Sequence, residues 1–251
     1  MITTLAIALL AAGGLDDATM EEISAKVEHV QRTYDLDEAL AIMPALQQKM
    51  NVSVDEMNTE LRMMLAETTV LAATLLRYEY EEPDKSNKEK RALGDEIDRV
   101  SAIGLNALGG LPDISEKHRI TADLLAMKMR TKFRGNKHHD AMEENINKAL
   151  VRDPLNPKAL QSQSRRKLFA EVEHGGDFPA GLKILNRAIE LDPDDEAAFI
   201  LRGLAFEREG MHAEAIADWE KAIELNPDAQ PAKEHLQRLR NKESATENAV
   251  E

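Results

Sequence analysis

One short motif recurs along the C-terminal half of the chain. NRAIELDPDDEAA begins at Asn186, and EKAIELNPDAQPA begins at Glu220, an offset of 34 positions. A third copy, NKALVRDPLNP, begins at Asn147, and a faint fourth, NALGGLPDIS, begins at Asn106. A period of this length is typical of solenoids, in which each repeat is a pair of helices that stacks on its neighbours.

Each copy contains an Asp-Pro, Asn-Pro or Leu-Pro step, and the spacing of these prolines sets the repeat length. Pro193 and Pro227 are 34 positions apart, whereas Pro154 and Pro193 are 39 positions apart. Proline cannot continue the preceding helix but is accepted in the turn before the next one. The middle unit therefore has five extra residues. We predict that they lengthen its first helix, which begins at Asn156 and Pro157.

The composition predicts helices rather than strands. Aromatic residues make up only 4% of the chain, while the good helix formers Ala, Leu, Glu, Lys and Met are plentiful. No run of alternating Val, Ile, Thr or Tyr indicates a strand. We therefore predict an all-α fold, an α-α superhelix of helix hairpins that is preceded by an N-terminal helical region.

The unit from Glu196 to Ala229 resembles a tetratricopeptide repeat (TPR) over its full length. The positions that carry the resemblance are Phe199, Gly203, Phe206, Ala215, Trp219, Ala222 and Pro227. Gly203 and Ala215 lack bulk, so the two helices of the hairpin can approach each other closely there. Arg202 replaces the leucine of the family pattern, and we predict an exposed or edge position for it.

Two earlier units are in step with this one and extend the resemblance to about residues 118–240. The unit 162–195 has Leu168, Leu185, Ala188 and Pro193 in place, with Arg165 instead of the large aromatic residue and Gly181 instead of alanine. The unit 123–155 keeps Met129, Phe133, Ile146, Ala149 and Pro154, with Met142 at a small-residue position.

The chain after the last repeat begins with an amphipathic segment. Ala232, Leu236 and Leu239 have helical spacing there, and we predict a helix that covers the last repeat as a cap. The polar residues 241–251 follow, and we predict that they form a disordered tail.

The residues 15–117 are predicted to form an N-terminal helical region with a degenerate TPR-like hairpin. Thr19 and Glu22 have the spacing of a capping box, and Asp35 opens a second helix in which Pro44 predicts a kink or break. Ser53 or Asp55 is predicted to cap a long helix that runs to about residue 80.

The first residues, 1–14, are apolar or small throughout. They are too few to span a bilayer, and we predict no integral membrane span. An apolar stretch followed by small residues favours a secretory signal and a periplasmic location. No Lys or Arg precedes the apolar stretch, so the alternative is a native first helix in a cytoplasmic protein.

The net charge of −14 argues against two classes of partner. A strong negative field repels phosphate backbones and anionic lipid headgroups, so we expect no nucleic acid or membrane surface as a partner. Cysteine is absent, which excludes disulfides, thiolate nucleophiles and zinc–thiolate sites.

His138, His139 and Asp140 form the string that most resembles a metal site. Three ligand-type residues in one turn do not complete a coordination shell. We instead predict that the string lies at the turn between the two helices of a repeat, with Asp140 as an N-cap. The sequence contains none of the common nucleotide, zinc-protease or hydrolase motifs, so we predict no catalytic residues, no metal and no cofactor.

A basic stretch interrupts this acidic chain, with Lys128, Arg130, Lys132, Arg134 and Lys137. On one continuous helix these residues divide into two groups and form no single stripe. The plain alternative is a set of solvated helix faces that pair with nearby acids; the functional alternative is a patch that docks an acidic peptide. The carboxylate clamp of chaperone-binding TPR proteins is not supported, because its matching positions are Met127, Thr131, Lys167, Ala197 and Leu201.

The resemblance implies that the first helices of the repeats line an inner face. By register that face has Met127, Thr131 and Arg134, then Gln163, Arg166 and Ala170, then Ala197, Ile200, Leu204 and Glu207. We predict partner contacts at Met127, Arg134, Gln163, Arg166, Ile200 and Leu204. The alternative is that the N-terminal helices already cover this face.

The resemblance implies a non-catalytic scaffold or adaptor that binds a protein or peptide partner during complex assembly or regulation. The alternative is a structural or oligomeric accessory component, for example a TPR-like component of a periplasmic transport system. In that case Met57, Met63 and Met64 would form a self-association face.

Overall fold

The computed structural model describes residues 18–52, 55–172 and 175–248. These residues form helices joined by turns and short connections, and no strand occurs among them. The helices are α2 (Met20–Thr33), α3 (Leu36–Val52), α4 (Asp55–Glu81), α5 (Asn87–Leu108), α6 (Ser115–Lys128), α7 (Lys132–Arg152), α8 (Pro157–Phe169), α9 (Phe178–Leu191), α10 (Glu196–Arg208), α11 (His212–Leu225) and α12 (Gln230–Asn248). The predicted all-α class is confirmed.

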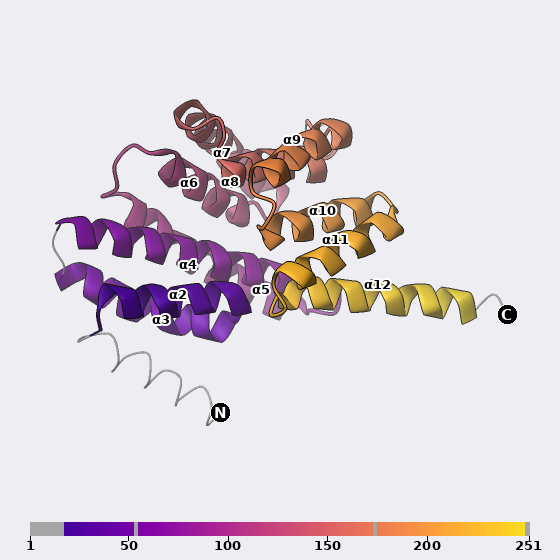
Figure 1. Ribbon diagram of the computed structural model, residues 1–251, viewed down its shortest axis with the longest axis horizontal. Coiled ribbons are helices and arrows are strands. Elements are labelled where there is room, and N and C mark those ends of the chain that lie inside the picture. Colours follow the sequence, from indigo (N-terminus) through magenta and orange to yellow (C-terminus); the bar gives the residue numbers. More distant parts are fainter. Residues whose placement is uncertain (1–17, 53–54, 173–174, 249–251) are drawn as a thin grey trace, which may run out of the picture. The chain divides into compact units, whose positions relative to one another are not determined.

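Consecutive helices pack against each other as hairpins, which is the arrangement expected of a TPR-type α-α fold (Figure 1). The closest pairs are α4 with α5, α6 with α7, α8 with α9, and α10 with α11. The chain divides after Arg152 into two compact units, which we call unit 1 (residues 1–152) and unit 2 (residues 153–251). This division falls within the range 118–240 that was predicted for the array.

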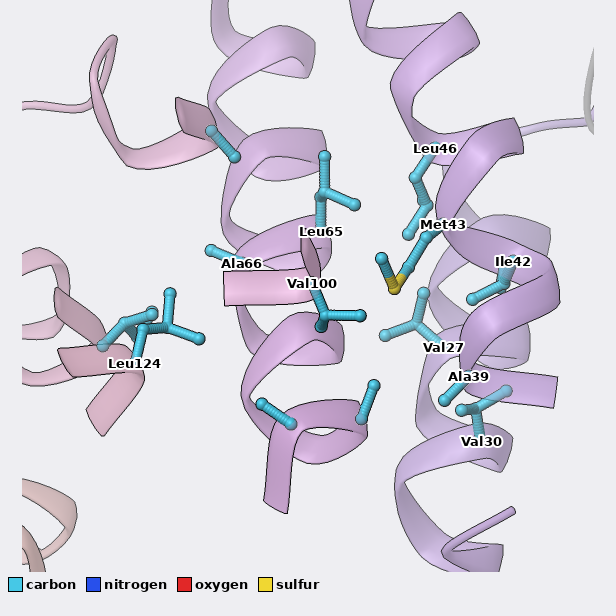
Figure 2. Packing of buried hydrophobic residues seen from close by; sticks show 14 of the residues in the cluster. Val27, Val30, Ala39, Ile42, Met43, Leu46, Leu65, Ala66, Val100 and Leu124 are labelled. Atoms are coloured by element: carbon cyan, nitrogen blue, oxygen red, sulfur yellow. The ribbon is translucent and has the colours of Figure 1, made fainter. Parts of the chain in front are cut away.

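The core of unit 1 lies between α2, α3, α4, α5 and α6. Figure 2 shows side chains from these helices meeting in one apolar interior, among them Val27, Met43, Leu65, Val100 and Leu124. Each of these five side chains is at most 4% exposed. Burial of this apolar surface is the main force that holds the five helices together, because a fully buried aliphatic side chain contributes roughly 1.5–3 kcal/mol.

The starts of the first two described helices follow the sequence signals. Thr19 and Glu22 form the predicted capping box, and Asp35 accepts a hydrogen bond from the Glu38 amide at 2.9 Å. Pro44 does not break α3, which continues to Val52. Proline removes one amide donor, and the buried neighbours of Pro44 hold the helix in place within the core.

Two predictions for the N-terminal part fall outside the residues that the structure describes. These are the apolar leader, residues 1–14, and Ser53 as a cap; α4 begins at Asp55.

Unit 2 contains two hairpins, α8/α9 and α10/α11, whose corresponding helices have equal lengths. The first helices, α8 and α10, have 13 residues each, and the second helices, α9 and α11, have 14 each. The connection in α8/α9 spans residues 170–177, whereas that in α10/α11 spans only residues 209–211. The five extra residues therefore lie in the connection, and the prediction that they lengthen the first helix was wrong.

The long connection ends the first helix for a local reason. The Asp177 amide donates to the carbonyl of Lys167 at 2.8 Å, so the connection folds back on the end of α8. Gly175 has a φ of 86°, a conformation that glycine adopts without steric cost. Asp177 then caps α9 by accepting a hydrogen bond from the Ala180 amide at 3.0 Å.

The last helix extends further than predicted. α12 continues to Asn248 instead of giving way to a disordered tail at residue 241. Residues 241–248 contain no Gly or Pro to stop the helix. Residues 249–251 lie outside the described part of the chain.

Candidate functional site

The two hairpins of unit 2 share one register when residues are counted from the helix starts. Asn156 caps α8 by accepting from the Ala159 amide at 2.9 Å. Asp195 caps α10 by accepting from the Ala197 amide at 3.1 Å. Residues of α8 therefore correspond to residues of α10 that lie 39 positions later, whereas α9 and α11 are offset by 34.

This register corrects the residues that were predicted for the inner face of α8. The counterparts of Ile200 and Leu204 are Gln161 and Arg165, and not Arg166 and Ala170. The predicted residues correspond to an offset of 34 positions, which holds for α9 and α11 but not for α8, because the extra residues follow α8.

The same correction explains the missing aromatic residue of the middle repeat. The counterpart of Phe199 is Leu160, which packs against the apolar cluster around Leu168, Leu185 and Leu201. Arg165, which was predicted at this position, lies elsewhere on the helix and is partly exposed.

The six residues predicted to contact a partner lie in different environments. Met127 is 7% exposed and belongs to the core of unit 1, and Ile200 is 4% exposed, so neither offers much side-chain surface. Leu204, Gln163 and Arg166 are half-buried in unit 2.

Arg134, the sixth predicted residue, lies on α7 in unit 1. Its guanidinium group contacts the Asp98 carboxylate at 2.7 Å. Met127 and Arg134 therefore belong to unit 1, and the other four predicted residues belong to unit 2.

One row of residues on the first helices of unit 2 remains accessible. Counted from the helix starts, Arg165 on α8, Leu204 on α10 and Arg238 on α12 occupy the same position, because α12 begins 34 positions after α10. Arg165 and Leu204 are half-buried, and Arg238 is exposed. We call these three residues the inner row. The Arg238 guanidinium donates to the Glu207 carboxylate of α10 at 2.6 Å.

The inner row combines one apolar side chain with two planar, permanently charged groups. Guanidinium groups bind carboxylates with two parallel hydrogen bonds, and an aliphatic side chain between them offers apolar contact. Arg165 was not predicted as a contact residue because the predicted register of α8 is shifted by five positions, and Arg238 was not predicted because its helix was expected only as a cap. Counting from the helix start at Asn156 and Pro157 would have placed Arg165 in the row.

Hydrogen bonds within and between the hairpins of unit 2 hold the start of α10 in place. The Gln161 amide donates to the Asp195 carboxylate at 2.6 Å, which links α8 to the cap of α10. The Asn226 amide donates to the Glu196 carboxylate at 2.8 Å, which links the start of α10 to the end of α11. Side-chain contacts of this kind favour one arrangement of neighbouring hairpins.

Arg202 does not lie at the exposed or edge position that its departure from the family pattern predicted. Its guanidinium group donates to both carboxylate oxygens of Asp218, at 2.8 and 2.7 Å, and to the Asn186 side chain at 2.7 Å. Asp218 is 5% exposed, so the pair is largely shielded from water. Arg202 thus joins α10 to both α9 and α11, and its charge is needed to match a buried carboxylate.

A shallow, open hollow of about 250 Å³ lies between α11 and α12. Its lining residues are Ile223, Lys233, Leu236, Gln237, Arg240 and Asn241. These side chains are aliphatic, basic or amide-bearing, so the hollow combines apolar contact with positive charge.

The candidate metal string has a different position from the predicted one. His138, His139 and Asp140 lie inside α7 and not at a turn, because the connection between α6 and α7 spans residues 129–131. Asp140 is therefore no N-cap. In the described part of the chain, no group of three His, Asp or Glu side chains is placed to hold a metal ion.

Two of the methionines proposed for self-association pack against the core of unit 1. Met63 and Met64 are only partly buried, and both contact the apolar cluster of α2 to α6. Met57 lies outside the residues whose side chains the structure describes.

No helix in the described ranges is both long enough and apolar enough to cross a lipid bilayer.

Comparison with known families matches residues 197–229 to the family described as tetratricopeptide repeat. This range coincides with the hairpin α10/α11 and the turn that follows it. A comparison of the chain with curated proteins found no match.

Proposed function

We propose that this chain, whose residues 197–229 form a tetratricopeptide repeat, is a non-catalytic scaffold that binds a protein or peptide partner. The observation that carries the proposal is the repeat itself, followed by a further helix and preceded by a hairpin of the same helix lengths. Stacked helix hairpins present corresponding residues of their first helices in rows, and such rows are the binding surfaces of helical repeat arrays.

In this proposal the partner contacts the inner row, Arg165, Leu204 and Arg238. Leu204 supplies apolar contact at the centre of the row. The two arginines supply hydrogen bonds to carboxylates or backbone carbonyls of the partner on either side. Glu207 holds the Arg238 guanidinium group in position through the 2.6 Å hydrogen bond, which reduces the entropy that Arg238 loses on binding.

Photocrosslinking tests the proposal at residue resolution. A photoreactive benzoylphenylalanine is placed at Leu204 in one variant and at Ala217, an exposed residue of α11, in a matched control. Both variants are illuminated in extract of the source cells, and crosslinked proteins are identified by mass spectrometry. We expect a crosslinked protein at position 204 that is absent at position 217.

The crosslinked protein is then purified and titrated against purified variants by calorimetry. We expect Leu204→Glu and Arg165→Glu each to weaken binding by about tenfold or more, because central interface residues carry most of the binding free energy. Ala217→Glu serves as the control and should bind as the unchanged chain does. Equal crosslinking at both positions, or equal affinity of all variants, would contradict the proposal.

A further inference from the structure

A compact basic surface surrounds the connection between α6 and α7 in unit 1. Lys128, Arg130, Lys132, Arg134 and Lys137 lie within ten consecutive residues, 128–137, that contain no Asp or Glu. The whole chain has a net charge of −14. We call these five residues the basic turn, and their local charge is opposite to that of the chain as a whole.

The turn brings together charges that a continuous helix would separate. α6 ends at Lys128 and α7 begins at Lys132, so the chain changes direction between them. Lys128, Arg130 and Arg134 all reach one carboxylate, that of Asp98 on α5, at 3.5, 2.9 and 2.7 Å respectively. The sequence-based division into two groups was therefore wrong, because it assumed one uninterrupted helix.

Arg130 is the structural member of the basic turn. Its side chain is only 4% exposed, and its guanidinium carbon lies 6.0 Å from the centre of the Tyr80 ring. Gly94 leaves room for it, since a Cβ atom at that position would lie 3.3 Å from the Arg130 Nε atom. The ion pair of Arg130 with Asp98 is largely buried and holds the connection between α6 and α7 against α5.

Two cations of the basic turn, Lys132 and Lys137, are available to a partner. Within the described ranges, neither Lys132 nor Lys137 has an ion pair, and both are exposed. Asp98 balances only one of the three positive charges that contact it. Burial and the positive charges of Lys128, Lys137 and Arg134 lower the pKa of His138, against the opposing effect of Asp98. The local field is therefore positive even after Asp98 is included.

An exposed aromatic ring lies among these charges. Phe133 is 79% exposed, although it is one of the residues that carry the predicted repeat 123–155. It falls at the start of α7, where Phe133, Lys137 and Arg134 lie on one side of the helix at the helical spacing of about 100° per residue. An exposed aromatic residue beside unpaired cations is typical of a protein-contact surface, because it adds apolar contact to charge attraction.

The basic turn is short. Acidic residues begin again at Asp140 and continue with Glu143 and Glu144. The positive part of α7 therefore covers about two helical turns, or roughly 10 Å. A nucleic acid strand would extend beyond it onto a chain of net charge −14 and be repelled there. A short acidic segment matches its length and charge.

We propose that the basic turn binds a short acidic segment of a partner protein. An aromatic or aliphatic residue of that segment contacts Phe133, and the carboxylates of the segment contact Lys132, Arg134 and Lys137. This binding surface lies in unit 1 and uses no residue of the inner row, so it goes beyond the scaffold function proposed for unit 2 and can fail or succeed independently of it.

Fluorescence anisotropy of the full chain tests this proposal with a defined probe. The probe is a fluorescein-labelled peptide of about six residues, four acidic residues around a central Phe-Leu pair, which spans roughly 20 Å when extended. Two comparison probes are the same peptide with Gln in place of each acid, and a single-stranded oligonucleotide of equal charge. We expect the acidic peptide to bind more tightly than either, and its affinity to fall as salt is raised.

Variants of the chain assign the binding to the basic turn. Lys132→Glu/Lys137→Glu should weaken binding of the acidic peptide by about tenfold or more, and Phe133→Ser by about threefold to tenfold. The matched control is Lys88→Glu/Lys183→Glu, which changes the net charge equally at two other exposed lysines and should leave binding unchanged.

Three outcomes would overturn the proposal. One is equal binding of the acidic and Gln peptides. Another is equal loss in the control and the Lys132→Glu/Lys137→Glu variant, which would show a general charge effect. The third is tighter binding of the oligonucleotide than of the peptide, which would identify a nucleic acid surface instead. Circular dichroism of each variant confirms that a loss of binding is not a loss of fold, since all the substituted residues are exposed.

Discussion

The hairpins α8/α9 and α10/α11 have helices of the same lengths but place glycine on different helices of the pair. In α10/α11 the small residue is on the first helix: a Cβ atom at Gly203 would lie 2.4 Å from the Trp219 Nε1 atom. In α8/α9 it is on the second helix: a Cβ atom at Gly181 would lie 2.8 Å from the Leu168 Cγ atom. In each of the two hairpins one residue without a side chain leaves room for a large side chain of the facing helix.

The arrangement in α10/α11 is the one found in the hairpin that the family match covers. The family pattern places glycine on the first helix, as in α10/α11, and the match covers residues 197–229. In α8/α9 the corresponding residue is Ser164, which is fully buried and donates its hydroxyl to the Gln161 carbonyl at 2.8 Å. Equivalent helices can thus follow from residues that a pattern does not recognise.

The two hairpins also differ in what covers them. Leu185 of α9 and Leu201 of α10 belong to one apolar cluster. Their counterparts one repeat later are Trp219 and His235, whose rings stack with centroids 5.5 Å apart. An apolar cluster therefore joins α8/α9 to α10, the helix that follows it. Between α10/α11 and α12 its place is taken by the contact of Trp219 with His235, which can bind a proton.

The largest expected effect comes from removing the ring at the centre of α10/α11. Trp219 is fully buried, and Trp219→Ala should lower the free energy of unfolding by about 3–5 kcal/mol, because it leaves a large cavity. Leu185→Ala, the matched change in α8/α9, should cost about 2–5 kcal/mol. Urea unfolding followed by circular dichroism measures both. A loss below about 1 kcal/mol for Trp219→Ala would mean that the ring is not in the interior.

A smaller effect is expected where α10 departs from the family. Arg202→Leu restores the pattern residue, yet it should destabilise the chain by about 3 kcal/mol, because the buried Asp218 carboxylate loses its partner. Arg202→Leu/Asp218→Leu should recover most of the loss, since it removes the unpaired charge as well.

The control for this prediction is Gln163→Leu, at the counterpart of Arg202 on α8. It should change the stability by no more than about 0.5 kcal/mol, as expected for a partly exposed residue without a buried charge partner. An Arg202→Leu variant as stable as the unchanged chain would show that the ion pair does not stabilise the hairpin.

The smallest of the three effects depends on pH. Burial, together with the nearby charge of Arg238, lowers the pKa of His235 from 6.5 to about 4. Between these values the unfolded chain binds a proton that the folded chain does not, so stability falls as the pH is lowered from 6.5 towards 4. From pH 7 to pH 5 the loss attributable to His235 should be roughly 2 kcal/mol.

Urea unfolding at several pH values measures this loss. His235→Leu replaces the ring by a counterpart of Leu201 and should remove the part of the pH dependence that belongs to His235. If the pH dependence of the His235→Leu variant equals that of the unchanged chain between pH 7 and pH 5, then His235 is not shielded from water as the structure indicates.

The sequence predicted the parts of the fold that local rules decide. The capping box at Thr19, the start of a helix after Asp35 and the hairpin 196–229 follow from caps, period and close-packing residues. It did not place the five extra residues of the middle repeat, because proline spacing measures the length of a unit but not where within it an insertion lies.

The candidate sites were harder to predict because they depend on where the helices end. The residues of the basic turn form two groups on a continuous helix, but α6 ends at Lys128 and the chain turns there. Arg202 could not be assigned from its own position, since its partner Asp218 is 16 residues away on the next helix. Contacts of this kind arise from packing, and no periodicity in the sequence reports them.

The inner row depends on the register of α8/α9 as it is counted from the Asn156 cap. The distance between the two helices of this hairpin tests that register most directly. Because the chain has no cysteine, spin labels can be attached to introduced cysteines at two sites and their separation measured by double electron–electron resonance. The pairs are 158/183 in α8/α9 and 197/217 in α10/α11. We predict the same separation for both pairs, and a different one for 163/183, because five residues along a helix amount to about 7.5 Å. If 163/183 instead reproduced the separation of 197/217, the extra residues would lie in the first helix and the inner row would not exist.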